Sequence, residues 1–229
     1  MRLPTPFFIK PPEPVINPLN NSGSTLSNAN LQTYVAGSGV GTQTVATMAV
    51  STGKYYFEIT TGGGYSNCSM GLIDAAIQPS GFSSGNGRLF RAYDGQKATY
   101  PSGTVSAYGS AVSSGGVVGI AIDMDNRKIW ASVNGTWQAS GDPAAGTNAM
   151  FSDLSGTMVP FFGLYDTGAG SSQNVNFGQR PFAYTPPTGF KALNTQNLPD
   201  PTIKKGNQYF DVSLWSGGQS SPFNVVNSG

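Results

Sequence analysis

Serine, lysine and acidic residues occur in spacings that catalytic sites use, but the sequence contains no histidine. Gly81-Phe-Ser83-Ser-Gly85 matches the G-x-S-x-G nucleophile motif, and Ser51-Thr-Gly-Lys54 matches the S-x-x-K motif. Without histidine there is no Ser-His-Asp or Cys-His base and no His-ligated metal. We expect the first string to be a Gly/Ser turn, and the second leads directly into a predicted strand. We therefore predict that the protein is not an enzyme.

The acidic residues offer the remaining route to catalysis or metal binding. Asp123, Asp125 and Asn126 could present oxygen ligands to Ca²⁺, but the segment lacks the glycine and the distal glutamate of an EF-hand loop. Aspartate and asparagine are also expected there for turn formation alone. Glu58 has no acidic neighbour in sequence with which to form the carboxylate pair of a glycosidase. We expect no metal and no cofactor.

Aromatic residues near predicted strand ends indicate binding through loops instead. Aromatic rings beside amides and hydroxyls suit either sugar stacking or a protein interface. The alternative is that at least half of the rings belong to the core, because strand alternation places Phe90 and Tyr93 on opposite faces. The predicted loop-borne binding residues are Tyr65, Phe90, Arg91, Tyr93, Tyr100, Tyr108, Trp137 and Tyr165.

These side chains must be positioned by many short strands. In Gly53–Ile59, Tyr55, Phe57 and Ile59 point to one face and Tyr56 and Glu58 to the other. No stretch has helical periodicity, which favours a sandwich or closed sheet. Alternating segments predict strands at Leu26–Leu31, Val45–Val50, Tyr55–Thr60, Ser69–Ile73, Phe90–Tyr93, Lys97–Tyr100, Val117–Ile122, Ile129–Val133, Val159–Tyr165 and Asn174–Phe177.

The composition excludes several classes of protein. Only 10% of the 229 residues are charged and the formal net charge is +1, which argues against nucleic-acid binding. No apolar run is long enough for a transmembrane helix, so we expect no membrane insertion. The first residues lack the apolar region of a secretory signal peptide. Cys68 is the only cysteine, and we expect it to be a buried thiol.

The order of three motifs resembles the SPRY (B30.2-like) domain family. The motifs are GKYYFEI from Gly53, GIAIDMDNRKIWASVNGTW ending at Trp137, and NFGQRPF followed by PPTGF ending at Phe190. The resemblance covers residues 15–190. It implies an all-β fold, a bent antiparallel β-sandwich that binds partners through loops at one end and carries no catalytic machinery.

Extended arms are predicted on both sides of this sandwich. Residues 1–14 are rich in proline around Phe7, Phe8 and Ile9, so we expect an extended arm that docks on another subunit or packs on its own domain. Residues 191–229 form a connector and then a strand-like segment from Tyr209 and Phe210 to Trp215. We expect that segment to open a further module or to pair with another chain. This tail resembles bacteriophage and prophage structural proteins in which a SPRY domain precedes further modules.

The resemblance and the composition together predict a non-enzymatic bacteriophage structural protein. It would be a fibre, tail or capsid-decoration module, made in the host cytoplasm and located in the virion. Its expected partners are other virion subunits in a homo-oligomer, together with a glycan or protein of the host surface. The alternatives are a carbohydrate-binding adhesin and an intracellular adaptor that binds a peptide.

Overall fold

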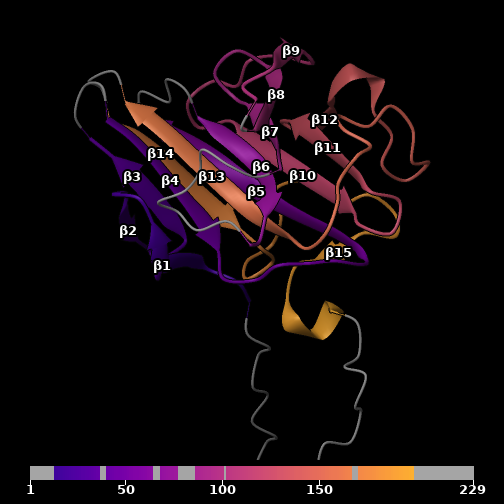
Figure 1. Cartoon of the computed structure of the whole chain (residues 1–229), viewed down its shortest axis with the longest axis horizontal. Coiled ribbons are helices and arrows are strands. Elements are labelled where there is room, and N and C mark those ends of the chain that lie inside the picture. The colour runs from indigo at the N-terminus through magenta and orange to yellow at the C-terminus, as the bar shows by residue number, and fades with distance from the viewer. Residues whose placement is uncertain are drawn as a thin grey trace, which may run out of the picture. The chain divides into compact units, whose positions relative to one another are not determined.

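Alternating residues build two β-sheets that pack face to face, as the computed structural model shows (Figure 1). The structure describes residues 13–36, 40–63, 68–76, 86–100, 102–166 and 170–198. They belong to one unit that ends at Leu198, while a second unit, Pro199–Gly229, lies outside the described residues. The predicted all-β sandwich is confirmed.

Sheet A has seven strands and sheet B has eight. In spatial order, sheet A contains β1 (Ile16–Asn21), β4 (Val40–Ala46), β13 (Met158–Asp166), β6 (Ser69–Asp74), β7 (Gly87–Arg91), β8 (Gln96–Tyr100) and β9 (Val105–Ala107). Sheet B contains β12 (Thr136–Trp137), β11 (Lys128–Val133), β10 (Val117–Asp123), β5 (Lys54–Gly63), β14 (Ser171–Asn176), β3 (Gln32–Val35) and β2 (Thr25–Ser27).

The eighth strand of sheet B lies in the segment predicted to be a connector. β15 (Lys191–Ala192) pairs in parallel with Tyr55 and Tyr56 of β5. β14 pairs with β5 only as far as Glu58, so β15 occupies the part of that edge that β14 leaves free. Residues 191–198, which include the short 3-10 helix Thr195–Asn197, therefore belong to the unit of the sandwich.

The main core lies between the two sheets. Phe57 of β5 contacts Phe162 of β13 across the sandwich, with ring centroids 6.4 Å apart, and Phe177 after β14 packs against both rings. Tyr55, Phe57 and Ile59 all belong to this core, which confirms the predicted alternation of β5. Cys68 is also fully buried in it, as predicted, and burial raises the pKa of its thiol to about 12.

The outer face of sheet B carries a second, smaller core. Trp130 and Tyr56 lie on that face, and the chain after β14 returns over them with Phe182 and Phe190. Glu58 is buried on the same face and accepts hydrogen bonds from the Tyr56 hydroxyl (2.9 Å) and from the backbone N–H groups of residues 183 and 184 (2.8 and 2.9 Å). This carboxylate thus holds the returning segment onto the sheet.

Several predicted strand boundaries were wrong for reasons of backbone conformation. The predicted strand Leu26–Leu31 is interrupted because Asn28, Ala29 and Asn30 adopt positive φ angles of 52°, 54° and 61°. β4 begins earlier than predicted and ends at Ala46, and β7 ends at Arg91, where a turn leads to β8. β1 and β9 were not predicted. The Asn134-Gly135 turn was predicted correctly, and both residues have positive φ.

Candidate functional site

A groove lies on the outer face of sheet A, the face opposite to the main core. It encloses about 370 Å³ and crosses β4, β13, β6, β7, β8 and β9. Its floor is apolar and buried, and consists of Leu89, Ala98 and Phe161. The remaining lining residues are Gly41, Thr42, Gln43, Ser69, Arg91, Thr99, Tyr100, Gly103, Val105, Gly163, Leu164 and Tyr165. We call this hollow the sheet A groove.

The groove exists because glycine replaces a side chain in the middle of the sheet. Phe161, Gly163 and Tyr165 alternate onto the outer face of β13, while Phe162 points into the core. Gly163 lies between Gln43 of β4 and Ser69 of β6 in the strand register. A Cβ atom at this position would lie 3.1 Å from the Phe161 ring, so a larger residue would fill the space above the floor.

Exposed apolar and aromatic side chains form the sides of the groove. Tyr165 is 39% exposed and Val105 is 37% exposed, and Tyr100, the last residue of β8, is half-buried. Tyrosine combines a large apolar ring with a hydroxyl, which suits contact with a partner in partly wet surroundings. The sides of the groove can therefore bury apolar surface of a ligand while still accepting and donating hydrogen bonds.

The groove lining carries little charge. Arg91 is the only charged residue among the described residues that line it. Its guanidinium forms an ion pair with Asp94 (2.9 Å) and lies 4.6 Å from the centre of the Tyr93 ring. These two contacts fix the orientation of the arginine side chain. Such a held guanidinium can donate hydrogen bonds to a carbonyl or carboxylate of a ligand.

One lining residue has an unused hydrogen-bond acceptor. The Oε1 atom of Gln43 is buried and has no hydrogen-bond partner in the described part of the chain. A buried polar atom without a partner costs free energy. A ligand N–H or O–H group in the groove would remove that cost. The groove thus combines an apolar floor with an acceptor whose hydrogen-bonding capacity is unused in the described residues.

The structure brings some of the predicted binding residues together. Arg91, Tyr100 and Tyr165 line the sheet A groove, and Tyr93 supports Arg91 beside it. The sequence prediction missed Gln43 and Gly163, along with the apolar floor. Strand alternation could have placed Phe161, Gly163 and Tyr165 on one face, but it could not show that this face is the outer one.

Three other predicted binding residues lie elsewhere, and for Phe90 the prediction was wrong. Phe90 is fully buried in the main core because it alternates with the outward-facing Leu89 and Arg91. Trp137 is half-buried and packs against Tyr56, with ring centroids 6.3 Å apart, on the outer face of sheet B. Neither of these two rings lines the sheet A groove.

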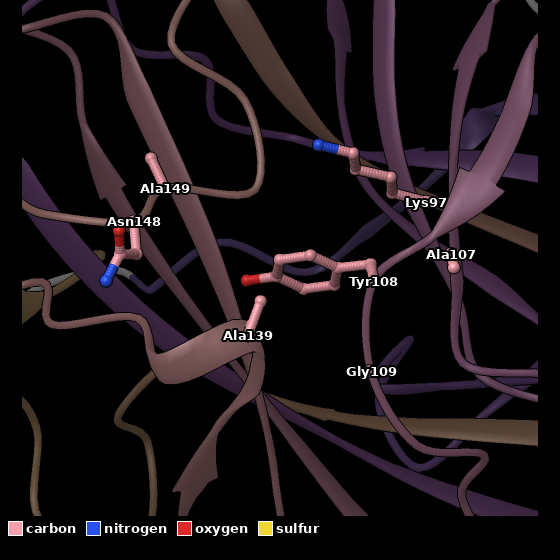
Figure 2. A pocket seen from close by; sticks show the side chains of 7 residues that line it. All are labelled: Lys97, Ala107, Tyr108, Gly109, Ala139, Asn148 and Ala149. Carbon is pink, nitrogen blue, oxygen red and sulfur yellow. The ribbon is translucent and has the colours of Figure 1, made fainter.

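Tyr108 lies in a separate, wide hollow of about 530 Å³ (Figure 2). Small residues surround its ring, including Ala139 and Ala149, and its hydroxyl accepts a hydrogen bond from the N–H of residue 131 at 3.4 Å. Lys97, whose ammonium lies 5.8 Å from the centre of the Tyr108 ring, donates a hydrogen bond to the carbonyl of residue 150 at 2.8 Å. Burial raises the pKa of Tyr108 to about 12, so the phenol stays neutral.

The predicted loop residue Tyr65 and the candidate residues of the two arms lie outside the described residues. The arm residues are Phe7, Phe8, Ile9, Tyr209, Phe210 and Trp215. Their predicted binding and assembly roles stay predictions.

The acidic residues considered as metal ligands have structural roles. Asp123 accepts hydrogen bonds from the backbone N–H and the side chain of Asn126 and forms a 3.1 Å ion pair with Lys54. Burial alone would raise the pKa of Asp123, but these bonds bring it below its ordinary value. Asp125 accepts a 2.7 Å hydrogen bond from the N–H of Gly53. Among the described residues, no group of three or more histidine, cysteine or acidic residues could hold a metal ion.

The fold and the groove define a β-sandwich binding module. Residues 54–180 match the family described as the SPRY domain, and the chain therefore belongs to the SPRY family. SPRY domains are protein-interaction modules without catalytic machinery. No long apolar helix capable of crossing a membrane occurs in the described residues.

Solved structures support the same fold. The SPRY domain of human HERC1 is 17% identical and superimposes with a TM-score of 0.54, covering 72% of this chain and 99% of that domain. Stonustoxin is 16% identical with a TM-score of 0.51, and the match covers 72% of this chain but only 27% of the toxin. A comparison with curated proteins finds no match. At these identities the likeness concerns the fold alone.

Proposed function

We propose that this SPRY domain binds a protein partner through the sheet A groove. The observation that carries the proposal is the contrast between the two outer faces of the sandwich. On sheet B, Phe182 and Phe190 cover the outward side chains. On sheet A, the apolar floor lies in a groove whose side chains Tyr165 and Val105 are more than one-third exposed. An apolar hollow with aromatic sides is typical of a binding surface.

The lining favours an extended peptide or loop over a charged partner. The ligand would place an apolar side chain on Leu89 and Phe161 and donate a hydrogen bond to Gln43. The guanidinium of Arg91 would donate hydrogen bonds to a carbonyl or carboxylate of the ligand. With no acidic residue in the described lining, the groove offers no attraction to a strongly basic ligand.

We further propose that the protein acts in a bacteriophage virion, as a fibre, tail or decoration module that contacts other virion subunits or the host surface. The support comes from the sequence: few charges, a proline-rich first segment, and a tail that resembles phage structural proteins. Mass spectrometry of purified particles from a strain that encodes the protein tests this location. Absence of the protein from particles that contain the other structural proteins would refute it.

Binding of a carbohydrate is the second candidate, because the exposed ring of Tyr165 could stack on a sugar. The wild-type protein is therefore applied to an array of random-sequence peptides and to a glycan array. Tyr165→Ala removes a groove residue, and Tyr34→Ala is its matched control, because Tyr34 is 40% exposed but lies on β3 of sheet B.

We expect peptide signals that fall about 10-fold or more in Tyr165→Ala and persist in Tyr34→Ala, as for a residue at the centre of an interface. Gly163→Val, which fills the groove, should have the same effect as Tyr165→Ala. Glycan signals with this pattern of losses would support an adhesin instead. Peptide binding that is equal in all variants would refute the groove as the binding site.

A further inference from the structure

The edge strand β9 is the last strand of sheet A and pairs only with β8 among the described strands. Val105, Ser106 and Ala107 are all exposed. In Figure 1, β9 lies beyond β8 and β7, with the rest of sheet A on one side of it. Its other edge presents backbone N–H and C=O groups to which another strand can bind.

The hydrogen bonds of the β8–β9 hairpin show which groups point outward. The N–H of Thr99 donates to the carbonyl of Thr104 at 3.0 Å, and the N–H of Gly109 donates to the carbonyl of Gly95 at 2.7 Å. Odd-numbered residues of β8 therefore point toward β9. Lys97 is paired with Ser106, so Ser106 directs its backbone groups toward β8. The backbone N–H and C=O groups of Val105 and Ala107 therefore point toward the free edge.

This edge lacks the proline and the register shift found at the opposite edge of the same sheet. At the opposite end of sheet A, β1 contains Pro18, and its register with β4 shifts along the strand. Proline and bulges both hinder the addition of another strand. In β9 there is no proline, its register with β8 is regular, and no charged residue occurs from Ala98 through Ile122. A regular uncharged edge accepts an added strand.

The spacing of the outward groups is symmetric about Ser106. We propose that β9 pairs with β9 of a second copy of the chain, antiparallel, around a twofold axis at Ser106. Val105 of each copy then exchanges N–H···O=C bonds with Ala107 of the other, and the two Ser106 residues lie opposite each other as a non-hydrogen-bonded pair. Sheet A of the two copies becomes one continuous sheet.

The absence of charge favours a second copy over a different partner. A twofold axis places each side chain opposite an identical set, so any charge on the edge would face a charge of the same sign. The nearby Lys97 does not create this repulsion, because its ammonium donates to the carbonyl of Met150 and lies 5.0 Å from the centre of the Phe151 ring. This pairing leaves the floor of the sheet A groove free, so it does not depend on the function proposed above.

Cysteine cross-linking of the full chain tests the register directly. In the proposed pair the two Cα atoms of residue 106 are about 4.5 Å apart, which is within the range that a disulfide bridges. The two Cα atoms of residue 105 are roughly 8 Å apart in the same register, which is too far. Ser106→Cys is therefore the test variant and Val105→Cys the matched control. Native Cys68 is fully buried and does not compete.

After mild oxidation we expect about 10-fold more covalent dimer from Ser106→Cys than from Val105→Cys, as the disulfide geometry requires. The double variant Ser106→Cys with Ala107→Pro should lose this dimer, since proline removes an outward N–H but no bond within the sheet. Equal yields from the two cysteine variants would overturn the proposal. Binding of an array peptide to this edge, without any Ser106→Cys dimer, would also overturn it.

Discussion

Replacement of Glu58 by glutamine should destabilise the protein by removing the anchor of the segment that covers sheet B. The buried carboxylate accepts three hydrogen bonds at 2.8 to 2.9 Å, from the Tyr56 hydroxyl and the N–H groups of Ala183 and Tyr184. A glutamine side chain keeps one acceptor oxygen and places an NH₂ group where the other oxygen was. At least one N–H of the returning segment then faces another donor.

The magnitude follows from the bonds that are lost. A hydrogen bond to a charged acceptor contributes about 1.5–3 kcal/mol, and a buried donor left without a partner costs a further 1–3 kcal/mol. Because these costs overlap in part, we expect Glu58→Gln to lower the free energy of unfolding by about 2–4 kcal/mol. For a protein of this size that corresponds to a fall in Tm of about 4–16 °C.

Tyr56→Phe is the matched control, since it removes only one of the three donors to Glu58. It should cost about 1.5 kcal/mol, the low end of the range for a bond to a charged acceptor, because the carboxylate keeps its two backbone donors. Urea and thermal unfolding of both single variants and the double variant measure these values and the coupling between the two residues. Peptide binding at the sheet A groove should be unchanged, because Glu58 lies on the other sheet. If Glu58→Gln destabilises the protein no more than Tyr56→Phe does, Glu58 does not anchor the returning segment.

Two further predictions concern titratable groups. Hydrogen bonds from Asn126 and the ion pair with Lys54 lower the folded-state pKa of Asp123 below its ordinary value of 3.8. The ionised carboxylate therefore contributes stability above pH 3.8, and this stability is lost as the pH falls through the folded-state pKa. Asp123→Asn should therefore flatten the decline of Tm below about pH 4; an unchanged acid profile would contradict this. Burial raises the pKa of Cys68 to about 12, so we expect thiol reagents to label it only after unfolding in urea, and rapid labelling of the folded protein at pH 8 would show that the thiol is accessible.

Local patterns in the sequence predicted the local structure well where one face of a strand is buried. Phe57 and Glu58 lie on opposite faces of β5 because neighbouring side chains of any strand do so. The turn at Asn134-Gly135 follows from the positive φ angles that these two residues tolerate. The same patterns misplaced strand ends at Asn28, where the backbone turns without glycine or proline.

The candidate site depended on contacts between residues far apart in the chain. Gly163 forms part of a groove because β13 pairs with both β4 and β6, which places it between Gln43 and Ser69. Glu58 had no acidic neighbour in sequence, and two of its three hydrogen-bond partners, Ala183 and Tyr184, lie more than a hundred residues away. Sequence periodicity contains no information on such pairings.

The sequence alone establishes the all-β class, the SPRY resemblance and the absence of histidine chemistry, since each depends on residue type or on the spacing of near neighbours. The tertiary structure decides which aromatic residues line the groove and which belong to the core. Phe90 and Arg91 are adjacent in the chain, yet one is buried between the sheets and the other lines the groove. The reason is physical: alternation separates two faces of a strand, but only the packing of the second sheet determines which face is buried.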